Sequence, residues 1–191
     1  MRPTLLQPSD LFFTCGDSKV SKAIRWFTRD KGEPKTKTNH TGGVSDGGTL
    51  SQAEIIEAVS TVQSGPLMQR YGPPKKDRFA AYRYIPMTAD QQATVVRTAK
   101  GYEGRKYGYH RIAANVLDFG LSRTRGKNVY FFRRLAGMAD YPICSWLMAY
   151  SFEKAGISFG VPTDAATPDD IWDWVTGHPE LWLCVRPMTT L

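Results

Sequence analysis

The sequence predicts an α+β fold, with helices packed on a small, mainly antiparallel sheet. Two kinds of segment lead to this prediction. Short apolar or alternating runs are typical of strands, and longer runs with apolar residues at helical spacing follow capping residues. The 191 residues contain no internal repeat and no low-complexity linker, so we expect a single domain that spans residues 1–191.

Five segments have the pattern of strands. They are Leu11–Thr14, a segment that opens at His40, and then Glu54–Ser60, Arg78–Ile85 and Leu181–Val185. A polar loop over residues 30–39 leads into His40, and a turn at Asp46–Gly48 precedes the third strand. Arg78–Ile85 is aromatic and roughly alternating, as expected of a strand with one buried face.

Five further segments have helical spacing, caps or both. The first follows Asp17 or Ser18, and the others begin after Thr88, at Arg111, after Pro142 and after Thr167. Thr88 and Gln91 form a capping-box pattern, and Thr167–Asp170 repeats it before a short helix with Ile171 and Trp174. The helix after Pro142 has the clearest apolar face and should end at Gly156.

The amino-acid composition indicates the class of protein, its location and its partners, but not a reaction. Hydrophobic residues make up 41% and charged residues 23%, which is ordinary for a globular chain and argues against disorder. The N-terminal residues lack the pattern of a signal peptide, so we expect a cytoplasmic protein, with a virion as the alternative location. A net charge of +7 indicates attraction to nucleic acid, anionic lipid or a cell-wall polymer, without choosing among them. A solvated basic surface with no specific partner is the alternative.

Cys144 has the most informative position among the three cysteines. It stands at the start of the helix after Pro142, where the helix dipole and the first backbone amides favour a thiolate and can hold an oxyanion. A small buried hydrophobe is the alternative reading of such a cysteine. Cys15 and Cys184 flank or occupy apolar strands, and we expect both in the core. The sequence has no CxxC pair and no zinc-ligand spacing, and we expect no cofactor.

His40 is the strongest candidate for a base that would serve Cys144. It opens a predicted strand at the rim of the sheet, and a hairpin would bring Glu57, on the next strand, beside it. A carboxylate there would bond one ring nitrogen and leave the other to face the thiol. Capping or packing explains His110, and a surface turn explains His178.

These segments resemble the circularly permuted branch of the papain-like NlpC cell-wall peptidase superfamily, the branch of the YiiX-like proteins. In unpermuted members a Cys-Ser at a helix start precedes the histidine strand. Here Asn39–Val44 and Glu54–Ala58 come first, and Tyr141–Leu147 follows. Further matches, which extend the resemblance over nearly the whole chain, are Asp10–Phe13, Ser21–Phe27, Phe152–Ile157 and Thr167–Asp170.

The resemblance implies a papain-like fold with Cys144 as nucleophile, His40 as base and Glu57 as the residue that orients the base. It also implies that Tyr107 helps to hold the oxyanion, for which aromatic packing is the alternative. Two features depart from the family pattern. An extra glycine after Thr41 would shift the strand register, and a basic, aromatic insertion spans Arg123–Arg134.

The activity implied is that of a cysteine peptidase or amidase that cleaves an amide or ester through a thioester. Peptidoglycan stem peptides are the expected substrate, and a bacteriophage virion or tail would provide a setting. Lipid acyl transfer or lipid amide hydrolysis is one alternative, with a lipid surface as partner, and a catalytically idle basic binding module is another. Nucleic acid is not the expected partner, because no helix-turn-helix, RRM or zinc-finger signature occurs.

Overall fold

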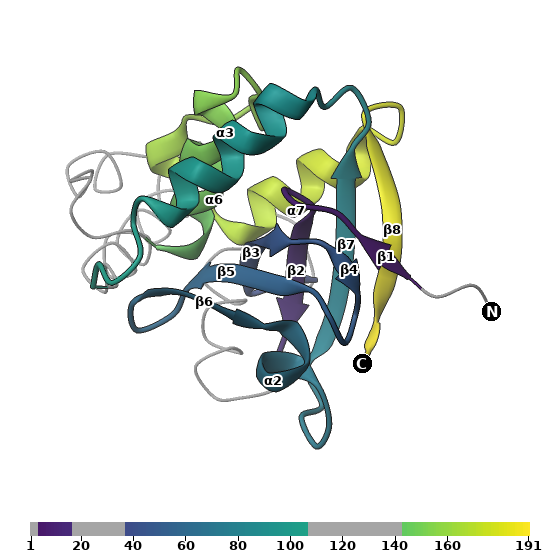
Figure 1. The fold of residues 1–191 in the computed structure, drawn as a ribbon. Helices are drawn as coiled ribbons and strands as arrows, with labels where there is room; N and C mark the ends of the chain where they lie inside the picture. Colours follow the sequence, from purple (N-terminus) through teal and green to yellow (C-terminus); the bar gives the residue numbers. More distant parts are fainter. Residues whose placement is uncertain (1–3, 17–36, 107–142) are drawn as a thin grey trace, which may run out of the picture.

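A six-stranded antiparallel sheet organises the fold (Figure 1). The structure is a computed structural model, and it describes residues 4–16, 37–106 and 143–191. In spatial order the strands of the sheet are β6 (Val62–Pro66), β5 (Glu54–Ala58), β3 (His40–Asp46), β2 (Leu11–Cys15), β7 (Arg78–Tyr84) and β8 (Trp182–Thr190). Two short strands, β1 (Leu5–Leu6) and β4 (Gly48–Thr49), pair separately. This architecture confirms the α+β prediction.

Side chains on both faces of the sheet are buried. In β2, Leu11 and Phe13 join the larger apolar cluster, whereas Phe12 between them joins a second cluster. Successive side chains of a strand point to opposite faces, so the central strands need cover on both sides. The helices provide this cover.

Three longer helices lie on one face of the sheet, and a short helix lies on the other (Figure 1). The three are α3 (Ala89–Lys100), α6 (Cys144–Lys154) and α7 (Pro168–Gly177), with the 3₁₀ turn η1 (Thr163–Ala165) before α7, and the short one is α2 (Leu67–Tyr71). Both predicted capping boxes are present, at Thr88 with Gln91 and at Thr167 with Asp170. None of the described helices is long and apolar enough to cross a membrane.

Most of the predicted boundaries that fall on described residues hold within two residues. β5 ends at Ala58 rather than Ser60, because the chain turns there into β6, and neither β6 nor α2 was predicted. β8 continues to Thr190 through Pro187, which an edge strand tolerates because one side of its backbone has no partner among the described strands. The helices predicted from residue 17 and over 111–119 lie outside the described residues.

One cysteine prediction is wrong. Cys15 is buried as expected, but Cys184 is exposed. The apolar run Leu181–Val185 indicated a buried strand, yet β8 is the outermost strand, and its register against β7 shifts beside Tyr82. Only Trp182 of this run is buried, which leaves Leu183 and Cys184 facing solvent.

The two glycines of β3 leave its register intact near His40. β2 and β3 pair without a break from Leu11–Gly43 to Thr14–His40, so the expected shift does not occur there. The irregularity with β5 falls between Val44 and Asp46 instead. Gly42 is required for packing, because a Cβ at this position would lie 2.4 Å from Cζ of Phe12.

We therefore expect Gly42→Ala to destabilise the protein by about 2 kcal/mol, the usual cost of an overpacked core position. The same Cβ would lie 2.8 Å from the backbone oxygen of Ile56, so a rotation of Phe12 alone would not relieve the clash. Urea unfolding measures the effect. Gly177→Ala is the matched control, because nothing lies within 4 Å of its Cβ position, and equal midpoints for the two variants would contradict this account.

Candidate active site

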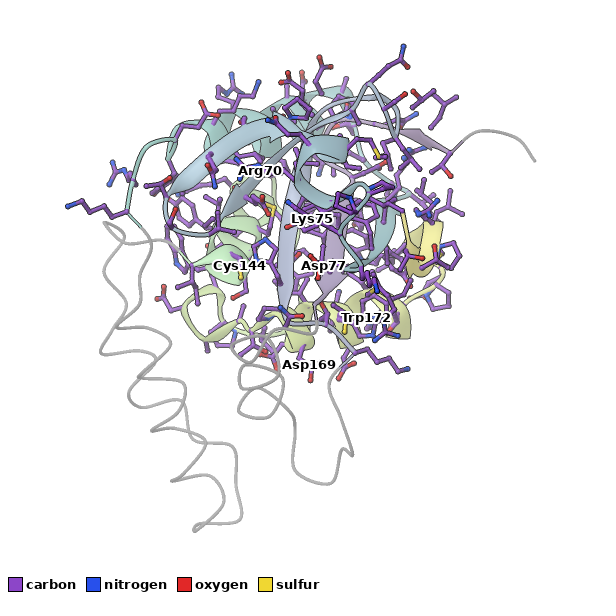
Figure 2. The ribbon with its side chains drawn as sticks, turned by 90° about the horizontal axis from the view of Figure 1, so that it is seen from below. Arg70, Lys75, Asp77, Cys144, Asp169 and Trp172 are labelled. Atoms are coloured by element: carbon purple, nitrogen blue, oxygen red, sulfur yellow. The ribbon has the colours of Figure 1, made fainter. Side chains whose placement is uncertain are left out.

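Cys144 is the first residue of α6, and its neighbour Ile143 is the N-cap residue in an extended conformation with no side-chain capping bond. The helix has 11 residues, enough to give its N-terminus the partial positive charge that favours an anion. Figure 2 labels Cys144. The residue is 5% exposed. The sulfur therefore lies at the N-terminal end of α6, largely out of solvent.

α6 packs directly against β3, which brings the starts of these two elements together. A Cβ added at Gly43 of β3 would lie 3.1 Å from Sδ of Met148, one turn into α6. At the beginning of β3 the hydroxyl of Thr38 donates to the backbone oxygens of Thr14 and His40, at 2.9 and 3.0 Å. The backbone that carries His40 is thus held in place beside β2.

Glu57 lies within hydrogen-bond distance of His40. The imidazole Nε2 is 2.7 Å from the carboxylate Oε2. The pairing of β3 with β5 explains this, since Gly43 lies opposite Ile56 and the side chains alternate. Glu57 and His40 then project from the same face as diagonal neighbours on adjacent strands.

The other side of the imidazole interacts with Cys144. With Nε2 engaged by Glu57, Nδ1 is the ring nitrogen left for the hydrogen bond with the thiol. Burial acts to lower the pKa of His40, but the charge of the Cys144 thiolate, its hydrogen bond and the Glu57 carboxylate together raise that pKa to about 10. The imidazolium is therefore the stable form at neutral pH, and the same attraction stabilises the thiolate.

Glu57 is 2% exposed, and it keeps its charge through its partners. Burial alone would raise the pKa of this carboxyl, but the bond and charge of His40, the Tyr71 hydroxyl and the Arg70 guanidinium bring its pKa below the ordinary value. The Tyr71 hydroxyl donates to Oε2 at 2.5 Å, and Nε of Arg70 is 3.8 Å from Oε1. Both residues belong to α2 (Figure 2 labels Arg70).

The arrangement can carry out nucleophilic chemistry. A thiolate is the reactive form of cysteine, an imidazolium beside it can return a proton to a leaving group, and the backbone amides at a helix N-terminus can stabilise an oxyanion. Three of the four predicted site residues, Cys144, His40 and Glu57, come together in this way. Tyr107 lies outside the described residues, as do His110 and the basic insertion.

Sequence reasoning missed Arg70 and Tyr71 because it missed α2. The signal was weak but present, since Leu67 and Tyr71 are apolar residues four apart, directly after Pro66. His178, the other histidine among the described residues, contacts α7. Nδ1 of His178 is 2.7 Å from the backbone oxygen of Trp174 at the end of α7, where the two rings also contact each other.

Comparison with known proteins shows the fold. A scan against protein-family models finds no match, and a search of curated proteins also finds none. A solved structure that is similar is described as the metalloprotein YiiX from Escherichia coli O157:H7, DUF1105. It has a TM-score of 0.53 and 18% sequence identity, with 97% of this chain and 88% of that chain covered. The α+β arrangement of this chain thus has a structural counterpart in a YiiX protein, and this fits the resemblance to YiiX-like proteins.

The similar structure is described as a metalloprotein, so the residues of this chain that could bind a metal are of interest. Within the described ranges no group of three or more His, Cys, Asp or Glu side chains is placed to hold a metal ion. Cys144 and Glu57 sit against different nitrogens of the same imidazole. These three residues therefore do not fit a metal site.

The imidazolium–thiolate pair predicts how thiol reactivity depends on pH. Below its pKa of about 10, His40 is protonated and stabilises the thiolate, so Cys144 should react with iodoacetamide at pH 5.5. An ordinary thiol is then only about 0.1% ionised, given a pKa of roughly 8.5. We expect Cys144 to react at least about tenfold faster than the exposed Cys184, even after allowing for the lower nucleophilicity of a stabilised thiolate.

His40→Ala should abolish this advantage at pH 5.5 and leave little difference above pH 9, where any thiol is largely ionised. Mass spectrometry of the labelled peptides measures each cysteine separately. Equal, slow labelling of Cys15, Cys144 and Cys184 would show that no activated pair exists.

Proposed function

We propose that this protein is a cysteine hydrolase of circularly permuted papain-like type, which cleaves an amide or ester bond through a thioester. One observation carries the proposal: the His40 imidazole lies between the Cys144 thiol and the buried Glu57 carboxylate. The order of these groups along the chain, with His40 and Glu57 before Cys144, supports the permuted arrangement.

The first half of the reaction forms the acyl-enzyme. The Cys144 thiolate attacks the carbonyl carbon, and the resulting oxyanion is held by backbone amides at the start of α6. The tetrahedral intermediate then collapses and the bond to the leaving group breaks. The leaving amine or alcohol takes the proton from Nδ1 of His40, and the acyl group stays on sulfur as a thioester.

The second half of the reaction restores the enzyme. His40, now neutral, accepts a proton from water as the water oxygen attacks the thioester carbon. The carbon–sulfur bond breaks, the acyl group leaves as a carboxylic acid, and the thiolate is again paired with the imidazolium. Glu57 keeps its hydrogen bond to Nε2 throughout, so it orients the ring and stabilises its charge without itself taking a proton.

The substrate class that we propose is the peptide portion of an anionic polymer, with peptidoglycan stem peptides as the main candidate. The net charge of +7 favours association with such a polymer, since long-range attraction raises the rate of encounter. The polymer would then be the partner of this protein, and the amide bonds of its stem peptides would be the sites of cleavage.

Incubation with purified peptidoglycan tests the proposal. The wild-type protein should release soluble fragments with new amino and carboxyl ends, and Cys144→Ala should release them about a thousandfold more slowly or not at all, because the nucleophile is gone. Mass spectrometry of the supernatant identifies the bond.

Cys184→Ala is the matched control for this experiment, since it removes an exposed thiol from the edge strand and should release fragments at the wild-type rate. Equal release by the wild-type protein and Cys144→Ala would count against wall hydrolysis by this site.

A further inference from the structure

Two side chains of α2 touch the proposed triad without belonging to it. The Tyr71 hydroxyl donates to Oε2 of Glu57 at 2.5 Å, and Oε2 is also the atom that Nε2 of His40 approaches to 2.7 Å. Arg70, the preceding residue, lies with Nε 3.8 Å from Oε1. Both oxygens of the carboxylate therefore have partners, and one of them is shared between the base and a tyrosine.

We propose that Tyr71 is a positioning residue: its hydroxyl holds the Glu57 carboxylate in the orientation and charge state that the His40–Cys144 pair requires. The inference rests on the proposed function, because the orientation of Glu57 affects catalysis only if His40 and Cys144 act together. Arg70 assists with its positive charge from the more exposed side of α2.

The position of the Tyr71 hydroxyl is set by aromatic packing rather than by Glu57. The ring is 5.7 Å from Phe12 in an edge contact and 6.1 Å from Phe79, and Tyr71 is 8% exposed. A packed aromatic ring has few alternative positions, whereas a glutamate carboxylate can rotate about the end of its chain. The Tyr71 hydroxyl is thus fixed by the packing of its ring, and its hydrogen bond limits the rotation of the Glu57 carboxylate.

The Tyr71 hydroxyl keeps its proton at working pH, so it can donate a hydrogen bond to Glu57. Burial raises its pKa well above the ordinary value of 10, and the charge of Glu57 raises it further. The hydroxyl thus keeps its proton and stabilises the ionised form of Glu57. Without this donor, Glu57 would more readily accept a proton at mildly acidic pH and would then no longer stabilise the imidazolium.

Few titratable groups face this carboxylate in the part of the chain that the structure describes. His40 faces it from β3, and Arg70 and Tyr71 face it from α2, while Cys144 of α6 faces the opposite side of the imidazole. The rate of Cys144 alkylation should fall at low pH, and we call this part of the pH profile the acidic limb. A change in the acidic limb can therefore be attributed to these four groups.

Tyr71→Phe tests the proposal, since it removes the hydroxyl and keeps the ring that packs on Phe12 and Phe79. The rate of Cys144 alkylation is followed from pH 4 to pH 10 by mass spectrometry of the labelled peptide. We expect the acidic limb to move up by about one pH unit, which makes labelling near pH 5 about tenfold slower, consistent with the loss of a hydrogen bond to a charged group. Above pH 9 the variant and the wild-type protein should react at similar rates.

Tyr82→Phe is the matched control. Tyr82 lies on β7 and packs against Phe13 and Trp172 on the other face of the sheet, so its hydroxyl does not reach Glu57. This variant should keep the wild-type profile. Arg70→Gln should shift the pH profile in the same direction as Tyr71→Phe but by less, because the contact of Arg70 with Glu57 is longer. Arg70→Lys keeps the positive charge and should stay close to the wild-type profile.

A double variant separates positioning from general stability. If Tyr71 acts through Glu57, then Tyr71→Phe should cause no further shift in a Glu57→Gln background, because the two effects share one path. Additive shifts, or a lower melting temperature with an unchanged profile, would overturn the inference. An ordinary-thiol profile in the wild-type protein would overturn the inference and the proposed function together. An activated wild-type profile that Tyr71→Phe leaves unchanged would overturn the inference alone.

Discussion

The pairing of a buried carboxylate constrains this part of the molecule more than any other interaction. A carboxylate as deeply buried as that of Glu57 is tolerated in charged form only where its oxygens have hydrogen-bond or ionic partners. Those partners come from separate elements, His40 from β3 and both Arg70 and Tyr71 from α2. The burial of a charged Glu57 therefore depends both on the β3–β5 register and on the turn from β6 into α2. The candidate site thus depends on the same strand pairing that forms the sheet.

Two consecutive glycines, Gly42 and Gly43, allow close packing on both faces of β3. Gly42 leaves room for the ring of Phe12, which also contacts His40 and Tyr71. Gly43 faces the other way and leaves room for Met148 of α6. Because neither residue has a Cβ, the aromatic cluster and the helix both approach the strand closely. Cys144 can then reach His40 from the layer of α6, while Glu57, held by Tyr71, contacts His40 on the other face of the sheet.

Local signals in the sequence were sufficient for the elements that hold the proposed triad. A cysteine at a predicted helix start, a histidine at a predicted strand start and an acidic residue on the next strand could each be identified from neighbouring residues, and the antiparallel hairpin brought the last two together. Arg70 and Tyr71 could not be found in this way, because their contact with Glu57 depends on how a five-residue helix folds back over the sheet. Cys184 was misplaced for a related reason. Its burial depended on which strand forms the edge of the sheet, and that is a property of the whole topology rather than of an apolar run.

The charges around His40 alternate in sign from the thiolate through the imidazolium and the carboxylate to the Arg70 guanidinium. Burial disfavours the charged forms of His40 and Glu57, and it opposes both the raised pKa of His40 and the lowered pKa of Glu57. The charged state is stable only because each member faces one of opposite sign, so removal of one member leaves its neighbour buried without full compensation. If Glu57 were removed, for example, His40 would lose a partner that favours its charged form, and the imidazolium would in turn stabilise the Cys144 thiolate less. Substitutions of Cys144, His40 and Glu57 should consequently have non-additive effects on thiol reactivity, because the charge of each residue depends on the others.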